Sequence, residues 1–252
     1  MPDLPFEILA LAVGITLFAG FVKGAVGFAM PLIMVSGLTT IMEPRLAVAA
    51  IILPIVISNV LQTFRTGVGP ALEALRGNWR YVLSVCIAIA VFAQLVPRID
   101  PQVFYLVLGI PVVVISVIQL FGLRFTIPPR HRGWAEWVAG ILSGILGGLA
   151  GTWGPTTVLY LLAIDMPKAR QMVVQGVIYG TGSMALLLAH LASGVLDRST
   201  APLSALLILP GLAGMWLGFR YQDRLDQRLF ARAVLSVLVV SGANLVWKGL
   251  SG

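Results

Sequence analysis

Charged residues are scarce in this sequence. Asp, Glu, Lys and Arg make up 11% of its 252 residues, against about 25% in an ordinary soluble domain. Hydrophobic residues account for 58%, and the mean hydropathy is +0.96. These values exclude a soluble globular protein. They predict an all-α, polytopic integral membrane helical bundle with little chain left for a soluble domain.

Acidic residues are missing from the interior of the apolar segments. The ones that border these segments lie at or near segment ends: Glu43, Glu73, Asp100, Glu136, Asp165 and Asp197. A cation pathway normally needs intramembrane carboxylates, so a cation or metal substrate is disfavoured. Metal-ligand spacing is also absent. We therefore expect neither a metal site nor a cofactor.

Several other signals are absent. The net charge of +7 comes from short loops, which argues against nucleic acid as a partner. No nucleotide-binding motif occurs, so we expect no direct ATP coupling. Ser183 and His190 invite comparison with an intramembrane serine protease, but they lie about two turns apart on one helix. The chain is not expected to be an enzyme.

Apolar runs bounded by charge, Gly and Pro predict about eight to ten hydrophobic segments. They lie near residues 6–22, 25–42, 46–64, 80–97, 102–121, 134–150, 155–165, 170–192, 202–219 and 231–248. The run at 155–165 is too short to cross a bilayer unaided. It is expected to form a hairpin or re-entrant pair with 134–150, as 25–42 does with 6–22.

Two glycine- and proline-rich segments, 20–31 and 140–155, interrupt apolar runs at matching places in the two halves. Gly20, Gly24 and Gly27 recur 120 residues later, and Pro31 recurs 124 residues later as Pro155. This periodicity predicts two membrane repeats, residues 1–122 and 134–252, joined by a cytoplasmic linker at 123–133. Lys and Arg favour cytoplasmic loops, and their distribution places the start of the first repeat outside and the start of the second repeat inside. The predicted repeats are therefore inverted.

Irregular backbone at membrane depth is tolerated where it lines a polar cavity, and paired interruptions point to a transporter's binding site. A helix that begins near Pro31 or Pro155 presents free N–H groups and a positive dipole end, which favour an anion. Gly20, Gly24, Gly140 and Gly144 have an equally good alternative role, because small residues also let two helices pack closely. Lys23 either snorkels to the interface or provides the counter-charge to the substrate.

These arguments define a set of candidate substrate-binding residues. Asn59 and Ser183 enter it because they are equivalent in the two repeats, and Thr152 and Trp153 because they offer a hydroxyl and an indole N–H inside the second segment. The full set is Lys23, Gly27, Phe28, Pro31, Asn59, Gly147, Gly148, Gly151, Thr152, Trp153, Gly154, Pro155 and Ser183.

The segments 20–31 and 140–155, together with Glu43–Ala49 and Pro167–Arg170, resemble the TauE/SafE family of membrane permeases. The resemblance covers nearly the whole chain and implies transport of sulfite, sulfonates or other organosulfur anions across the bacterial inner membrane. Two departures affect the expected contacts with the substrate. Phe28, Ala29 and Met30 separate Gly27 from Pro31, and the second segment is longer than usual, so a larger carboxylate or sulfonate is as plausible as sulfite.

Together these observations predict a multi-pass secondary transporter of the bacterial inner membrane that moves a small anion by alternating access. A permease for a small carboxylate or other solute, and a non-transporting membrane scaffold, are the alternatives. The expected partners are the anion and membrane lipid, with no nucleic acid. A coupling proton and a homodimer are both compatible with the sequence.

Overall fold

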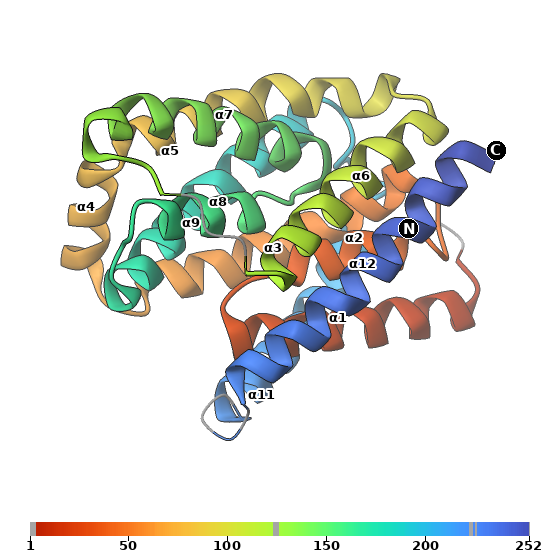
Figure 1. Cartoon of the computed structure of the whole chain (residues 1–252). Coiled ribbons are helices and arrows are strands. Elements are labelled where there is room, and N and C mark those ends of the chain that lie inside the picture. Colours follow the sequence, from red (N-terminus) through yellow and green to blue (C-terminus); the bar gives the residue numbers. More distant parts are fainter. Residues whose placement is uncertain (1–3, 123–125, 222–223, 225, 252) are drawn as a thin grey trace.

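The computed structural model describes residues 4–122, 126–221, 224 and 226–251, and within them the chain forms helices and no strand (Figure 1). The α-helices are α1 (Phe6–Val26), α2 (Met30–Leu38), α3 (Pro44–Phe64), α4 (Val68–Gly77), α5 (Trp79–Phe92), α6 (Pro101–Leu120), α7 (Arg132–Ala150), α8 (Gly154–Ala163), α9 (Lys168–Ala192), α10 (Ala201–Leu206), α11 (Ile208–Tyr221) and α12 (Gln227–Ser251). Two 3-10 helices, η1 (Ala93–Arg98) and η2 (Pro129–His131), extend α5 and precede α7.

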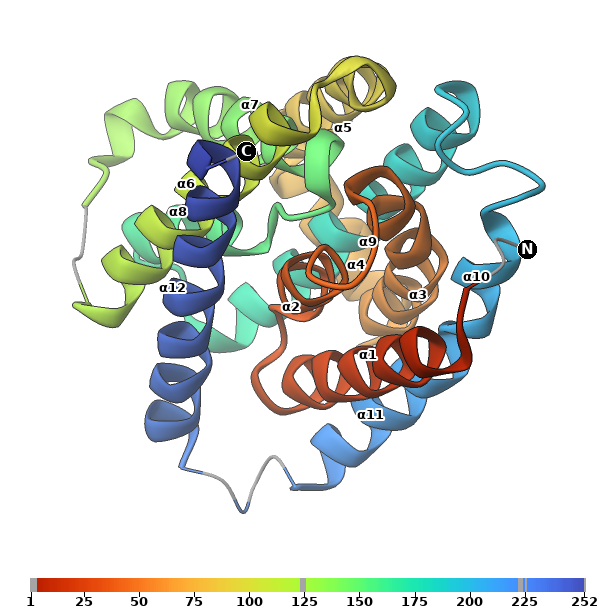
Figure 2. The same ribbon diagram turned by 90° about the vertical axis from the view of Figure 1, so that its right-hand side faces the viewer.

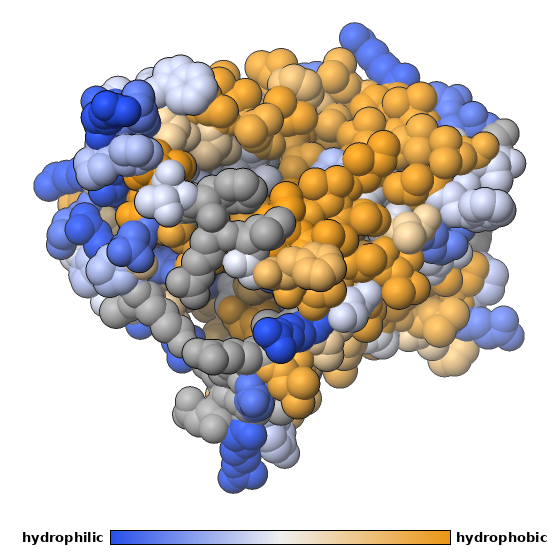
Figure 3. Space-filling view, in the orientation of Figure 1, coloured by the Kyte–Doolittle hydropathy of each residue, from blue (hydrophilic) through white to orange (hydrophobic). Residues whose placement is uncertain are grey.

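Eight helical stretches of the described residues are long and apolar enough to cross a membrane. They confirm the predicted polytopic all-α bundle, and their bounds follow the predicted segments to within a few residues. Figure 3 shows a broad apolar belt over the middle of one face, with hydrophilic side chains toward its edges. Exposed Leu209, Val240 and Trp247 belong to the large hydrophobic side chains that would face lipid.

The central helices are α3 and α9, which pack against each other, and 61% of the residues in the apolar window of each are buried. The corresponding share is 28% for α6 and α12, which pair at the periphery. Figure 2 shows α12 beside α6 and α1 along α11. Because α3 and α9 have the largest buried share of the candidate spans, an internal site is expected between them.

Helix pairing crosses the boundary between the two predicted repeats. Helix α1 of the first half packs along α11 of the second half. Helix α7 of the second half likewise packs along α5 of the first half. Two halves related by an internal two-fold axis would pack in this reciprocal way. Of the predicted linker 123–133, residues 123–125 lie outside the described residues, and α7 already begins at Arg132.

Glycines lie where the backbones touch in both helix pairs, α1 with α11 and α5 with α7. A Cβ on Gly20 or Gly24 would collide with the main chain of α11, at the carbonyl oxygens of Gly211 and Met215. A Cβ on Gly140 or Gly144 would collide with α5. The packing interpretation of these four glycines is therefore the correct one, because small residues let two membrane helices approach to backbone contact.

Replacing Gly24 by leucine is expected to destabilise the bundle. The side chain would force α1 away from α11, and overpacking of this kind costs about 1–3 kcal/mol. The thermal unfolding midpoint in detergent should fall relative to the parent protein. Gly14→Leu is the matched control, because a Cβ at that exposed position of α1 meets no atom within 4 Å. Equal midpoints for the two variants would contradict this account of the helix pair.

Candidate functional site

The first interruption lies between α1 and α2, and we call residues 27–29 the first break. Gly27 ends α1 in the left-handed conformation with φ of 88°, and its N–H donates to the Lys23 carbonyl at 2.8 Å. Glycine suits this cap because it has no Cβ to strain. Ala29 also has positive φ, 77°, which costs a residue with a Cβ about 1–2 kcal/mol. Such strain at a helix start suggests a functional constraint.

The second interruption separates α7 from α8, and we call residues 151–153 the second break. Gly151 ends α7 with φ of 67°, and its N–H donates to the Gly147 carbonyl at 2.7 Å. The helix α8 then begins at Gly154 with Pro155 in its first turn, just as Pro31 occupies the first turn of α2. Both half-helices therefore start with amide groups that have no acceptor within their own helix.

The two breaks meet at one cavity between the central helices. Residues from α1, both breaks and the helices that follow them line it: Lys23, Phe28, Ala29, Pro31, Asn59, Gly151, Trp153, Gly154 and Tyr179. A water-sized sphere has about 20 Å³ of room inside it, which is enough for about one water molecule. The cavity is therefore narrow in this conformation, and the surrounding helices must move apart for a small solute to bind.

Lys23 brings a charged group into this cavity from the last turn of α1. Its side chain is 3% exposed. The Nζ atom donates to the Ser58 Oγ at 2.9 Å and to the Asn59 Oδ1, both on α3. Both acceptors are neutral, and no carboxylate of the described residues forms an ion pair with Lys23. Because Lys23 is buried among the helices, its side chain does not snorkel to the membrane interface.

Electropositive groups therefore converge on the cavity from three directions. The first turn of α2 borders it at Pro31, the first turn of α8 borders it at Gly154, and Lys23 lies on a third side. A helix N-terminus carries roughly half a positive charge and unpaired N–H donors. Among the residues that the structure describes, no acidic side chain lines the cavity. The arrangement can bind an anion through main-chain and ammonium donors.

Residues 12–245 match the family model described as "Sulfite exporter TauE/SafE". The chain belongs to this family. No curated protein and no solved structure matches it. TauE/SafE is a family of membrane transporters, and this member is a multi-pass membrane protein with eight candidate spans.

Gln62 and Tyr179 hold the two breaks of this TauE/SafE member. The Gln62 Nε2 donates to the Gly27 carbonyl at 3.2 Å, which ties the first break to α3. The Tyr179 hydroxyl donates to the Gly154 carbonyl at 3.2 Å, which ties the start of α8 to α9. Sequence reasoning did not select Tyr179 as a site residue. The sequence feature that could have identified Tyr179 is its position in an apolar run, directly before a Gly-Thr-Gly-Ser stretch.

A buried network of hydroxyl groups fixes α8 from its other side. The Tyr81 hydroxyl lies 2.6 Å from the Ser143 Oγ, and Ser143 donates to Thr156 at 2.7 Å. Thr156 and Thr157 both donate to the Trp153 carbonyl at 2.8 Å. This network joins α5, α7 and α8 at the second break, and full satisfaction of buried polar groups makes such a connection rigid.

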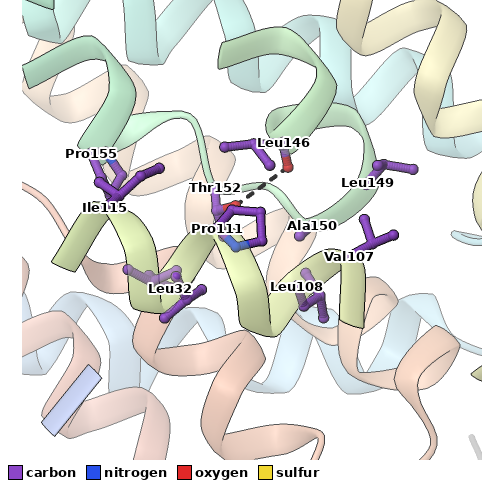
Figure 4. A pocket seen from close by; sticks show the side chains of 11 residues that line it. Leu32, Val107, Leu108, Pro111, Ile115, Leu146, Leu149, Ala150, Thr152 and Pro155 are labelled. Atoms are coloured by element: carbon purple, nitrogen blue, oxygen red, sulfur yellow. Dashed lines mark hydrogen bonds between the residues drawn. The ribbon is translucent and has the colours of Figure 1, made fainter. Parts of the chain in front are cut away.

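The structure places some predicted residues away from this cavity. Thr152 and Pro155 line a separate apolar cavity with residues of α2, α6 and α7, and the Thr152 hydroxyl is directed at the Leu146 carbonyl (Figure 4). Along the second break, neighbouring residues thus face opposite ways. Gly151 and Gly154 line the cavity with Lys23, whereas Thr152 and Pro155 line the apolar one.

Four further predicted residues have other roles. Gly147 and Gly148 pack against α5 at Ile89, where a Cβ would come within 3.0 Å of it. Ser183 is buried and donates to the Gly180 carbonyl of its own helix at 2.9 Å. Gly27 shapes the first break without lining the cavity. The described residues contain no group of three His, Cys, Asp or Glu side chains placed to hold a metal ion.

Proposed function

We propose that this protein is a secondary transporter that moves a small sulfur-containing or organic anion across the bacterial inner membrane. The anion binds in the cavity between the two breaks. The observation that carries the proposal is Lys23, a buried amino group that lines the cavity between the starts of α2 and α8 and has no acidic partner among the described residues. A bound anion would provide the missing counter-charge.

The lining of the cavity favours an anion with a small organic part. Backbone N–H groups, Lys23 and Asn59 offer donors, while Phe28 and Trp153 form apolar walls. Sulfite, a short sulfonate and a sulfoacetate-like molecule all meet these requirements. A small carboxylate presents similar oxygen atoms and is the alternative substrate.

Alternating access is the mechanism that the fold supports best. The cavity lies at the junction of two half-helices, and reciprocal pairs, α1 with α11 and α5 with α7, flank it. Rigid-body rocking of such paired elements around a fixed site opens it to either side in transporters with inverted repeats. A membrane scaffold would need neither the cavity nor its buried lysine.

The purified protein in liposomes is expected to take up anions selectively. We expect uptake from a panel of labelled sulfite, sulfoacetate, methanesulfonate and short carboxylates to exceed that of protein-free liposomes at least tenfold for one or more members. Sodium and divalent metal ions should not enter. Cation uptake without anion uptake would overturn the proposal, and inactivity of the whole panel would favour the scaffold alternative.

A further inference from the structure

The hydrogen bonds of Lys23 account for two of its hydrogens. Its Nζ has two acceptors in the protein, the Ser58 Oγ and the Asn59 Oδ1. The Ser58 hydroxyl donates its own hydrogen to the Ile55 carbonyl at 3.0 Å, so it can only accept from Lys23. A neutral amine has two N–H donors and an ammonium has three. The two acceptors satisfy both N–H groups of a neutral amine. The third hydrogen of an ammonium group would have no acceptor among the described residues.

The third position of Nζ is available to the cavity. Lys23 is buried among helices and lines the same cavity as both breaks. In the neutral amine this position is a lone pair, and in the ammonium it is an N–H donor that only a cavity ligand can satisfy. An anion in the cavity is such a ligand. Protonation of Lys23 and occupation of the cavity are thereby linked through one hydrogen.

The charged side chains at the ends of α3 and α11 nearest Lys23 are basic. Arg65 follows the last residue of α3, Arg220 lies in the last turn of α11, and α2 has no charged residue. Glu43 and Arg45 lie at the opposite end of α3, and Glu7 lies in the first turn of α1. On α12, which also touches α1, the described charged side chains are Arg232 and Lys248. Tyr179 is the other titratable side chain that lines the cavity. The positive ends of α2 and α8 add to this field.

An unpaired ammonium group is therefore unfavourable in the empty cavity. A charge without a counter-ion is costly inside a membrane protein, and the neighbouring positive groups increase this cost. A bound anion reverses the balance, because the two opposite charges pair in a region of low dielectric constant. By reciprocity, protonation of Lys23 must strengthen anion binding as much as the anion favours protonation.

We propose that Lys23 is the site of a coupling proton, so that the protein carries one proton together with each anion. The amine takes a proton from solvent when the anion enters and returns it to solvent on the other side when the anion leaves. This inference rests on the proposed function. For a monovalent anion the cycle is electroneutral, so the membrane potential should have no direct effect on uptake.

The test uses the full chain in liposomes that contain a pH-sensitive dye. Methanesulfonate, sulfoacetate and sulfite are added outside in turn, and anion uptake and internal pH are followed together. Methanesulfonate is especially informative because it stays ionised at neutral pH, so any acidification must come from protons that the protein carries. We expect methanesulfonate uptake to acidify the interior. An inward proton gradient of one pH unit should drive about tenfold accumulation. A potential set by potassium and valinomycin should leave methanesulfonate uptake unchanged.

Lys23→Arg separates the charge from the proton. Arginine keeps a positive charge at every accessible pH, so any anion that this variant moves should enter without acidification and should respond to the potential. Lys248→Arg is the control, since Lys248 lies on α12 near Tyr105, outside the cavity, and should behave as the parent protein. Gel filtration identifies variants that fail to fold.

The outcomes separate the inference from the proposed function. Anion uptake by the parent protein that follows the potential, with no acidification, overturns proton coupling and leaves anion transport standing. An unchanged proton-to-anion ratio in Lys23→Arg would also overturn the assignment to Lys23. If none of the three anions and none of the short carboxylates enters, the proposed function fails, and the inference fails with it.

Discussion

Replacing Lys23 by methionine is expected to lower anion uptake about a hundredfold. Methionine keeps most of the apolar stem but removes the charge that faces the cavity. Removing one partner of a buried, hydrogen-bonded charge pair costs about 2–5 kcal/mol, and each 1.4 kcal/mol is a factor of ten. The variant should still fold, because no carboxylate of the described residues forms an ion pair with Lys23 that the substitution would break.

The measurement for Lys23→Met is the initial rate of uptake into liposomes, normalised to folded protein. Lys248→Met is the matched control, because it removes a lysine from a membrane helix outside the cavity. It should retain the parent rate. Loss of uptake in both variants would mean that general positive charge, and not the cavity, supports transport. Full activity of Lys23→Met would remove the central donor from the mechanism.

Replacing Gly154 by valine is expected to abolish transport by filling the cavity. Gly154 is the first residue of α8. A Cβ at this position meets the Tyr179 Oη at 3.4 Å and the Phe28 Cβ at 3.8 Å, which are ordinary contacts. The position therefore accepts a side chain without forcing helices apart. The two further methyl groups of valine would occupy space that the anion needs, because a water-sized sphere has only about 20 Å³ of room in this cavity.

Gly154→Val should show at least a hundredfold loss of uptake with a thermal unfolding midpoint near that of the parent protein. Gly14→Val is the control for added bulk, since a Cβ there meets no atom within 4 Å. Gly148→Val provides the contrast, because it should lower the unfolding midpoint through its contact with Ile89 on α5. Normal transport by a folded Gly154→Val protein would exclude the cavity as the binding site.

The helix bounds and the breaks could be predicted from the sequence because local chemistry determines them. Gly27 and Gly151 cap helices with positive φ, and Pro31 and Pro155 restart them. Each of these preferences depends on the residue and its immediate neighbours. The length of the apolar runs similarly determined where helices could span a bilayer.

The orientation of individual side chains could not be predicted, because it depends on which helices pack together. Neighbouring residues of the second break face two different cavities, and the sequence alone gave no reason to separate Trp153 from Thr152. Ser183 was selected by its repeat position relative to Asn59, yet its hydroxyl turns to its own helix. Tyr179 reaches the site only because α9 passes beside α8.

The most direct test of the account is to locate a bound anion. Selenite is a close analogue of sulfite, and its selenium atom can be identified by anomalous scattering. The account predicts one selenium peak in the cavity, with its oxygen atoms within hydrogen-bond distance of the Lys23 Nζ and of main-chain N–H groups at the starts of α2 and α8. The peak should disappear in Lys23→Met. A transport-competent protein that binds selenite only outside this cavity would contradict the account.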